Sequence, residues 1–429
     1  MFKLKYNALS LAQIFFGFLN SILLLKVFGV SVQTDAYFIG DVIMGGALMV
    51  QVMAIEQFMY FYNDLKARDR AGASALYAYA LSLTLVIGLS AFAALNLFSG
   101  PIIALFAYKL DPERLETLRR LFPVFSLLAV FNPLHTLNAR LLNGEARFAY
   151  PYALGIIPSL FSAGAMIFIY FTGRSDIIWL LAASVSGMGM AAILGLAAVR
   201  SCGVPLRLSL SHPAGAEFVV NSFKVKLGHN VNNILAPLIT NNLLASFSPG
   251  AVSYFGYAWK IVTVTGNLTT GPSARMLASS ISAAWPLADA ARIRGLGSKF
   301  TRLIIPVFSV SSAAAYAVLP FALGLVSSAR LDRGDIASVR SMFLALSVWY
   351  LVGLVESVYM QVCIASRRSR IFLVNNSIFI VIYLVIAVSV KDRLGIYAIP
   401  CGLILAQLVS LALYMRSSET VLGGLRPIR

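Results

Sequence analysis

The stretch LNSILLLKVFGVSVQTDAYFIGDVIMGGALMVQVMAIEQFMYFYND, Leu19 to Asp64, decides the fold. It contains the end of one apolar helix, a polar turn around Gly29 to Thr34, and a second long apolar helix. Three ionisable residues lie inside or beside the apolar runs, at Lys26, Asp41 and Glu56. Because a charge at membrane depth is expensive, these residues predict a hydrated surface lined by protein.

The composition of the whole chain agrees with this reading. Hydrophobic residues make up 59% and charged residues 12%, whereas a soluble domain has about a quarter of its residues charged. The formal net charge of +17 comes from basic residues scattered singly in short loops. That pattern excludes a nucleic-acid interface, which gathers its cations on one face. We therefore expect a polytopic membrane protein surrounded by membrane lipids.

The hydropathy pattern predicts an all-α fold with about twelve transmembrane helices. A spanning helix needs about 20 apolar residues, and the stretches that provide them are 8–29, 35–62, 73–98, 120–140, 149–172, 177–199, 218–247, 251–282, 300–325, 338–365, 371–390 and 395–416. The polar link Arg200 to Gly215 contains two prolines and separates six helices from six. It predicts two lobes, residues 1–207 and residues 208–429.

Internal similarity suggests that the two lobes arose by duplication. The first hairpin resembles NLLASFSPGAVSYFGYAWKIV, Asn242 to Val262, and the turn at Ala139 to Pro151 resembles that at Val362 to Val374. Both repeats run in the same direction, which predicts a pseudo-two-fold axis along the membrane normal. The alternative is that any two helical hairpins look alike.

Lysine and arginine are in excess in the N-terminus and in the alternate loops that share its side of the membrane. Cytoplasmic loops hold this excess, so both termini are expected in the cytoplasm. The first apolar run continues past the length of a signal peptide, which predicts a retained helix.

The helix at 218–247 is the most polar of the twelve. Steps of three and four place Lys226, Asn230, Asn233, Pro237 and Asn241 on one stripe, with His229 beside it. This stripe predicts a cavity lining, and hydrogen bonding between helices inside one lobe is the alternative. The next helix adds Lys260 and Arg275.

The acidic residues need partners at membrane depth. Asp41 and Glu56 are fifteen residues apart, or about 22 Å along a helix, so they cannot form one site. Asp41 could face Lys260, and Glu56 lies at a depth similar to His135, Arg275 and Glu356; these groups would form ion pairs or a relay for a proton or ion. Lys26 and Asp35 flank the first turn and are expected to form a structural clamp.

Motifs of enzymes are not found. The three histidines form no HExxH pattern, the three cysteines have no CxxC spacing, and there is no Walker loop. The sequence thus predicts neither an enzyme nor a cofactor or metal site, and any active transport would use an ion gradient or the membrane potential.

Three segments resemble the MviN/MurJ lipid II flippase family: LLLKVFGVSVQTDAYFIGDVI from Leu23, SFSPGAVSYFGYAWKIVTVTGNL from Ser246 and RLLNGEARFAYPYA from Arg140. The wider superfamily of multidrug, oligosaccharidyl-lipid and polysaccharide exporters shares the twelve-helix architecture. The resemblance implies an alternating-access transporter whose cavity takes a lipid-linked sugar headgroup. Where the family has cavity arginines this chain has Asn20, Leu48 and Met49, and Lys260 keeps a cation.

The leading hypothesis is a bacterial inner-membrane flippase for a polyprenyl-diphosphate-linked saccharide, either lipid II-like or a polysaccharide repeat unit. Cationic groups would attract the diphosphate, amides would bond sugar hydroxyls, and acids would orient the cations or carry a coupling ion; cell-envelope synthesis machinery is a further expected partner. The alternatives are a cation-coupled exporter of small molecules or drugs and a membrane scaffold without transport. The residues assigned to these roles are Lys260, Lys226, Arg275, Asn230, Asn233 and Asn241 for substrate, and Asp41, Glu56, His229 and Glu356 for charge.

Overall fold

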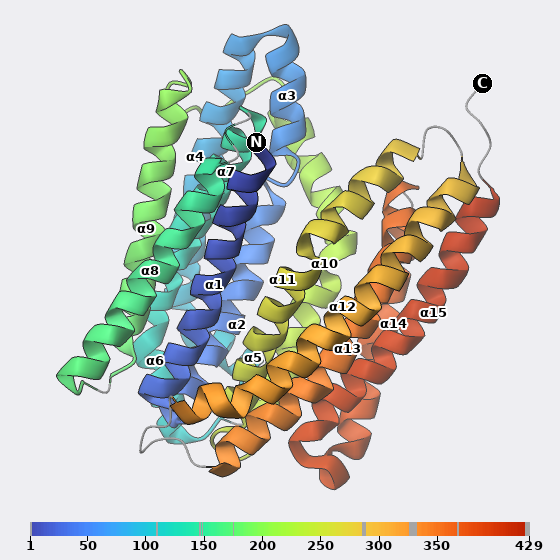
Figure 1. Ribbon diagram of the computed structural model, residues 1–429. Helices are drawn as coiled ribbons and strands as arrows, with labels where there is room; N and C mark the ends of the chain where they lie inside the picture. Colours follow the sequence, from blue (N-terminus) through green and yellow to red (C-terminus); the bar gives the residue numbers. More distant parts are fainter. Residues whose placement is uncertain are drawn as a thin grey trace. The chain divides into compact units, whose positions relative to one another are not determined.

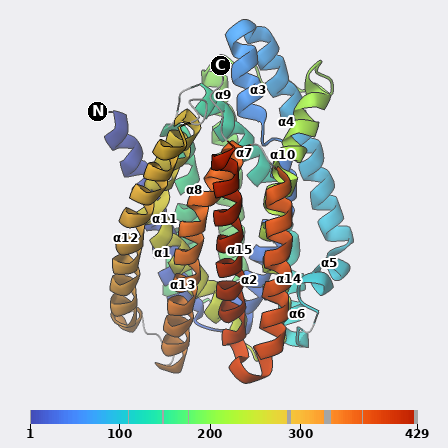
Figure 2. The same cartoon turned by 90° about the vertical axis from the view of Figure 1, so that its right-hand side faces the viewer.

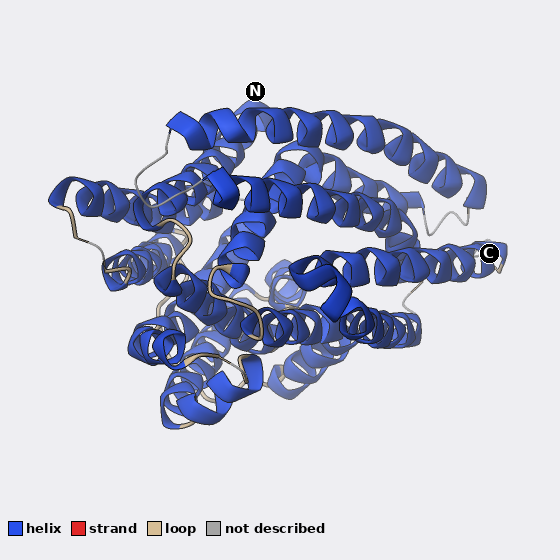
Figure 3. Cartoon of the chain, turned by 90° about the horizontal axis from the view of Figure 1, so that it is seen from below, coloured by secondary structure: helices blue, strands red, loops and turns tan. Residues whose placement is uncertain are grey.

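The computed structural model describes residues 2–108, 110–145, 147, 149–174, 176–284, 289–325, 333–366 and 369–424. Within these ranges the chain is helical and contains no strand (Figure 3). Its contacts divide it into unit 1, Met1–Asn230 with Ser248–Val252, and unit 2, Val231–Phe247 with Ser253–Arg429. The predicted all-α class is confirmed, and the predicted lobe boundary at residue 207 stays a prediction.

Unit 1 contains nine whole helices and the first half of a tenth in its described residues, together with the first two residues of α11 (Figure 1). They are α1 (Phe2–Phe28), α2 (Val32–Met53), α3 (Phe58–Arg68), α4 (Arg70–Leu97), α5 (Ser99–Phe106), α6 (Pro112–Ser126), α7 (Leu128–Gly144), α8 (Ala149–Thr172), α9 (Ile178–Ser201) and the first half of α10 (Gly215–Ala245). Unit 2 contains the rest of α10, most of α11 (Ala251–Ala284), then α12 (Ala290–Leu325), α13 (Arg333–Ala365), α14 (Ser369–Leu394), the 3₁₀ turn η2 (Gly395–Tyr397) and α15 (Ala398–Gly423).

Helix starts follow local chemistry that is visible in the sequence. Ser31 caps α2, and Asp69 caps α4 by accepting from the Ala71 amide at 2.9 Å. Asp111 caps α6, and Pro112 follows at a position where a missing N–H costs nothing. Gly29 supplies the positive φ of 63° that turns the chain between α1 and α2.

Each predicted span coincides with a helix or helix pair, but the one expected at 35–62 is broken into α2 and α3. Residues 54–57 form a tight turn with i to i−3 bonds such as Ala54 N to Gln51 O. The freed groups find side-chain partners: Arg140 donates to the carbonyl oxygens of Ile55 and Glu56, and Ser222 accepts from the Gln57 amide. The break therefore costs few unsatisfied backbone groups.

Small residues allow close packing inside unit 1. A Cβ on Gly88 would lie 2.9 Å from the Ala129 carbonyl oxygen, and one on Gly187 would lie 2.8 Å from the Pro158 Cα. These glycines bring α4 against α7 and α9 against α8. Such contacts stabilise helix pairs in lipid, where burial of apolar surface gives little driving force.

In unit 2, α15 packs between α13 and α14, as Figure 2 shows. Helix α12 packs on α13, with Phe300, Ile304 and Phe308 in one buried cluster with Leu354 and Val358. Among the described residues, eight segments are long and apolar enough to cross a membrane by length and composition, two of them containing two consecutive helices. The chain is thus a multi-pass membrane protein.

Candidate functional site around Asp35

The first turn of α2 is fixed by its own cap. The Ser31 Oγ accepts from the Thr34 amide at 3.4 Å, and the Thr34 Oγ1 accepts from the Ser31 amide at 2.9 Å. This reciprocal pair satisfies two backbone donors that a helix start leaves open. It holds Asp35, the next residue of the turn, in a defined direction.

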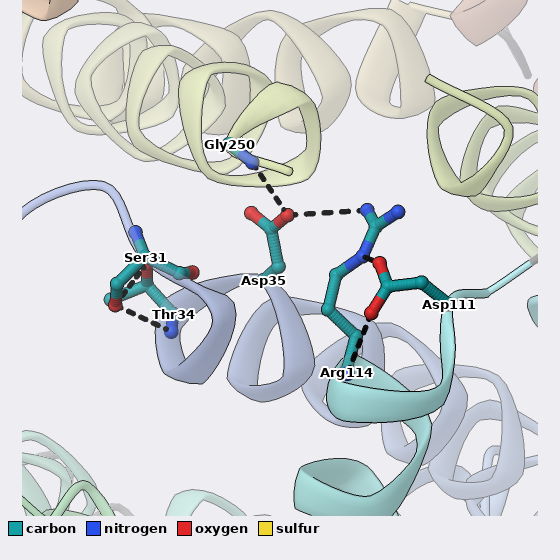
Figure 4. Close-up of polar contacts among 6 residues, drawn as sticks. All are labelled: Ser31, Thr34, Asp35, Asp111, Arg114 and Gly250. Carbon is teal, nitrogen blue, oxygen red and sulfur yellow. Dashed lines mark hydrogen bonds and ion pairs between the residues drawn. The ribbon is translucent and has the colours of Figure 1, made fainter. Parts of the chain in front are cut away.

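Asp35 is the centre of a buried charge network (Figure 4). Its side chain is 0% exposed, and its Oδ2 accepts from the Gly250 amide at 2.8 Å and from the Arg114 Nη1 at 3.3 Å. An ionised carboxylate without such partners would be very costly to bury. The cation and the amide together compensate this charge.

Arg114 is itself fixed on α6. Its side chain is 3% exposed, its amide donates to the Asp111 Oδ1 at 3.0 Å, and its Nε pairs with the Asp111 Oδ2. Burial alone would raise the pKa of Asp111, but the hydrogen bonds and charge of Arg114 outweigh it and hold this pKa below its ordinary value. The guanidinium therefore bridges two carboxylates and cannot easily leave Asp35.

The partner of Asp35 that remains, Gly250, lies in a short turn that belongs to unit 1. Ser248–Val252 belongs to unit 1, whereas Phe247 and Ser253 on either side belong to unit 2. Gly250 has a φ of 96°, which a residue with a Cβ adopts only with strain. Asp35 thus attaches the turn that begins α11, the helix of Lys260, to α2.

A second charged site lies at the break between α2 and α3. The Arg140 Nη2 pairs with the Glu56 Oε2 at 2.6 Å, and its Nη1 donates to the two carbonyl oxygens described above. The side chains of Arg140 and Glu56 are 20% and 22% exposed. Glu56 is therefore paired with an arginine of the last turns of α7.

Glu145, just after α7, forms a third site. Its Oε1 accepts from the Tyr62 hydroxyl at 2.7 Å and pairs with the Lys66 Nζ at 2.8 Å. Burial would raise the pKa of Glu145, but hydrogen bonds from Lys66 and Tyr62 and the charges of Lys66 and Arg70 together hold it below its ordinary value. This site ties α3 to the turn after α7.

Other predicted residues of unit 1 have different surroundings. The Lys26 Nζ lies 4.9 Å from the centroid of the Tyr170 ring, a cation–π distance. Asp41 is exposed and interacts electrostatically with Tyr37, one turn earlier. The clamp between Lys26 and Asp35 and the pairing of Asp41 with Lys260 stay predictions.

In unit 2, Lys260 is half-buried on α11, and Asn241 is buried with 3% exposure. Beside Asn241, the Thr240 hydroxyl bonds the Tyr383 hydroxyl of α14 at 2.6 Å. Glu356 is buried with 8% exposure, and its Oε2 accepts from the Gln407 Nε2 at 2.6 Å. The remaining predicted side chains lie outside the described residues: Lys226, His229, Asn230, Asn233 and Arg275.

Sequence reasoning missed Arg114, Arg140 and Gln407. Arg114 follows an Asp-Pro helix start, a signal for the cap but not for a partner 79 residues earlier in the chain. Gln407 lies in an apolar helix, and its polarity was the available signal.

The comparisons identify the family. The family model for the lipid II flippase MurJ matches residues 24–424. The chain belongs to the MurJ lipid II flippase family. The match includes Asp35, Arg114 and Gly250 as well as Glu356, so the sites described above all lie inside the family region. No functionally curated protein sequence matches the chain.

Solved structures show the same fold. A lipid II flippase MurJ in an inward closed conformation is 14% identical, with a TM-score of 0.78 over 96% of this chain and 87% of that one. An inward-facing multidrug resistance MATE transporter of the MOP superfamily is 16% identical, with a TM-score of 0.77 over 96% of this chain and 95% of that one. A MOP superfamily transporter from Pyrococcus furiosus is 14% identical, with a TM-score of 0.63 over 97% and 96% of the two chains.

Family membership and fold together confirm the predicted flippase class. The MATE structures share the architecture that a drug exporter would have, but the family model points to MurJ. The fold, the membrane location and the flippase class are therefore established at the level of the family.

Proposed function

We propose that this chain moves a polyprenyl-diphosphate-linked saccharide from the cytoplasmic to the outer leaflet of a bacterial inner membrane, with both termini in the cytoplasm. The observation that carries the proposal is the family match over residues 24–424. The saccharide is lipid II-like or a polysaccharide repeat unit, and the cell-envelope synthesis machinery supplies and consumes it.

In this proposal Lys260 is the main attraction for the diphosphate. It lies ten residues after Gly250, or about 15 Å along α11, and the start of α11 is held by Asp35. A charge-assisted bond to a phosphate oxygen is among the stronger polar contacts available to a ligand. Lys226 and Arg275 add positive charge, while Asn230, Asn233 and Asn241 bond sugar hydroxyls.

The acidic residues have supporting roles. Glu56 keeps Arg140 over the end of α2 and so fixes the α2–α3 break. Asp41 and His229 orient nearby cations, and Lys26 and Asp35 act at the first turn. The two lobes, residues 1–207 and 208–429, are the halves that alternate access to the substrate.

A leaflet assay tests the proposal. Proteoliposomes containing the full chain are loaded with a fluorescent polyprenyl-diphosphate saccharide, and the fraction reached by an external quencher is followed over time. Lys260→Ala should slow flipping at least about tenfold, which corresponds to the loss of one charge-assisted contact of about 1.5 kcal/mol, and Lys260→Arg should restore most of the rate.

The matched control is Lys299→Ala, since Lys299 is an exposed lysine of α12. It should flip at the rate of the unchanged protein. Flipping by Lys260→Ala at the unchanged rate would remove Lys260 from the substrate site. An absence of flipping by the unchanged protein, with intact folding, would favour the scaffold alternative, and efflux of organic cations instead would favour the exporter.

A further inference from the structure

Glu356 is a buried carboxyl group whose described partners are all neutral. It lies on α13, nine residues before the end of that helix and about 14 Å from it. Its Oε2 accepts from the Gln407 Nε2 at 2.6 Å, and the Ser410 side chain gives a second hydrogen bond. Both partners come from α15.

Among the side chains that the structure describes, no cation is paired with Glu356. On α15 the titratable group near Glu356 is Tyr414, which in turn lies near Cys363 of α13. The residues of α12 that share a buried cluster with this part of α13 are apolar, whereas Lys299 and Arg302 of α12 are exposed.

An ionised carboxylate in this place would be a charge at membrane depth with two neutral donors. Burial of an isolated charge is so costly that the group instead takes up a proton. The protonated acid is neutral, and it keeps the bond from Gln407. Gly353, one turn earlier, packs beside the same amide, since a Cβ there would lie 3.9 Å from the Gln407 Nε2, an ordinary van der Waals distance. The packed α13–α15 pair is therefore built for the protonated form.

We propose that Glu356 is a proton-binding site that couples proton exchange to separation of α13 from α15. Release breaks the carboxyl O–H bond, leaves the electron pair on the carboxylate and passes the proton to water. Glu356 is only 8% exposed in the packed pair. Water therefore reaches it only when α13 and α15 separate locally. The released carboxylate then opposes repacking until a proton returns.

Coupling of this proton to transport rests on the proposed flipping activity, whereas proton binding by Glu356 does not. A separate measurement can therefore test each of them.

Infrared difference spectroscopy of the purified full chain tests protonation without any substrate. Between alkaline and acidic buffer, the unchanged protein should show a carboxylic C=O band that is missing from Glu356→Gln. Glu419→Gln is the matched control, because Glu419 is an exposed carboxylate of α15 paired with Arg294 at 2.8 Å. It should keep the band. Gln407→Leu should shift the band to higher frequency, since the carboxyl loses a hydrogen-bond donor. Identical spectra for the unchanged protein and Glu356→Gln would overturn the proposal.

Flipping in proteoliposomes with an imposed pH gradient tests the coupling. The unchanged protein and Glu419→Gln should respond to the gradient by at least about fivefold, the lower range of coupling between sites, while Glu356→Gln should flip at a rate that ignores it. An equal response by Glu356→Gln would overturn the coupling. If the unchanged protein flips nothing, the proposed function fails while the infrared result still decides whether Glu356 binds a proton.

Discussion

Asp35, in the first turn of α2, and Glu356, inside α13, are both buried carboxyl groups. Charged partners stabilise the first, and neutral partners stabilise the second. Asp35 has a guanidinium and a backbone amide on one oxygen, and the guanidinium is held by a second carboxylate. Glu356 has an amide and a hydroxyl. A compensated carboxylate can stay ionised and hold two segments together permanently. An acid without a cation partner can instead gain or lose its proton when the helices around it move.

The largest expected effect comes from removing the cation of the compensated site. Arg114→Ala leaves Asp35 buried without its guanidinium, which should lower the free energy of unfolding by about 3–5 kcal/mol. Denaturant titration of the protein in detergent measures this change. Arg120→Ala is the control, since Arg120 forms an exposed pair with Asp176 and should cost less than about 1 kcal/mol. Equal losses for the two variants would mean that Asp35 is not compensated by Arg114.

An intermediate effect is expected at the partly buried pair of Arg140 and Glu56. Arg140→Ala leaves two carbonyl oxygens and a carboxylate without their donor, which should lower the free energy of unfolding by about 1–3 kcal/mol. The same titration measures it, with Arg68→Ala as control because Arg68 forms an exposed pair with Asp64. A loss of stability as large as that of Arg114→Ala would show that the size of these effects does not depend on how deeply the ion pair is buried.

A smaller effect is expected when the uncompensated acid is replaced by its neutral counterpart. Glu356→Gln keeps the shape and the acceptor oxygen for Gln407, so the free energy of unfolding near neutral pH should change by less than about 1 kcal/mol. Thermal unfolding of this variant is compared with that of Asp35→Asn, which removes one of the two carboxylates that Arg114 bridges. If Glu356→Gln is the less stable of the two, Glu356 is ionised and has a cation partner.

The smallest effect is a pH dependence at Glu145. Its pKa is below the ordinary value of 4.5, so the unfolded chain binds a proton more readily than the folded one. The stability from this group is present above that value and is lost as the pH falls through the lowered pKa. Thermal unfolding followed from neutral to acidic pH should show a loss that Glu145→Gln reduces, by less than about 1 kcal/mol for such a partly exposed group. A loss unchanged in Glu145→Gln would contradict the assignment.

Local features of the fold could be predicted from the sequence because they depend on neighbours in the chain. The apolar lengths gave the spans, and the turn at Gly29 and the cap at Ser31 follow from residue type. Charge partners could not be predicted in this way. Asp35 meets Arg114 and Gly250, which are 79 and 215 residues away, and the sequence offers many other basic residues and glycines as candidates.

The break in the second helix shows the same limit. Residues 54–57 contain neither proline nor glycine, so propensity predicts a continuous helix. The turn is stabilised by Arg140 and Ser222, which lie in other helices. Tertiary contacts therefore override local preference here, and similar reasoning explains why Gln407 could not be assigned to Glu356.

Helices α10 and α11 each belong partly to unit 1 and partly to unit 2, so a version of the protein split in the link between the predicted lobes would divide unit 1 between its fragments. A cut in the polar link at residue 207 would yield a carboxyl-terminal fragment that still contains 208–230 and Ser248–Val252, which belong to unit 1. The amino-terminal fragment alone would then expose Asp35 without the Gly250 amide. Co-expressed fragments should complement each other, whereas a cut placed just after Val252 would keep Gly250 on the same fragment as Asp35.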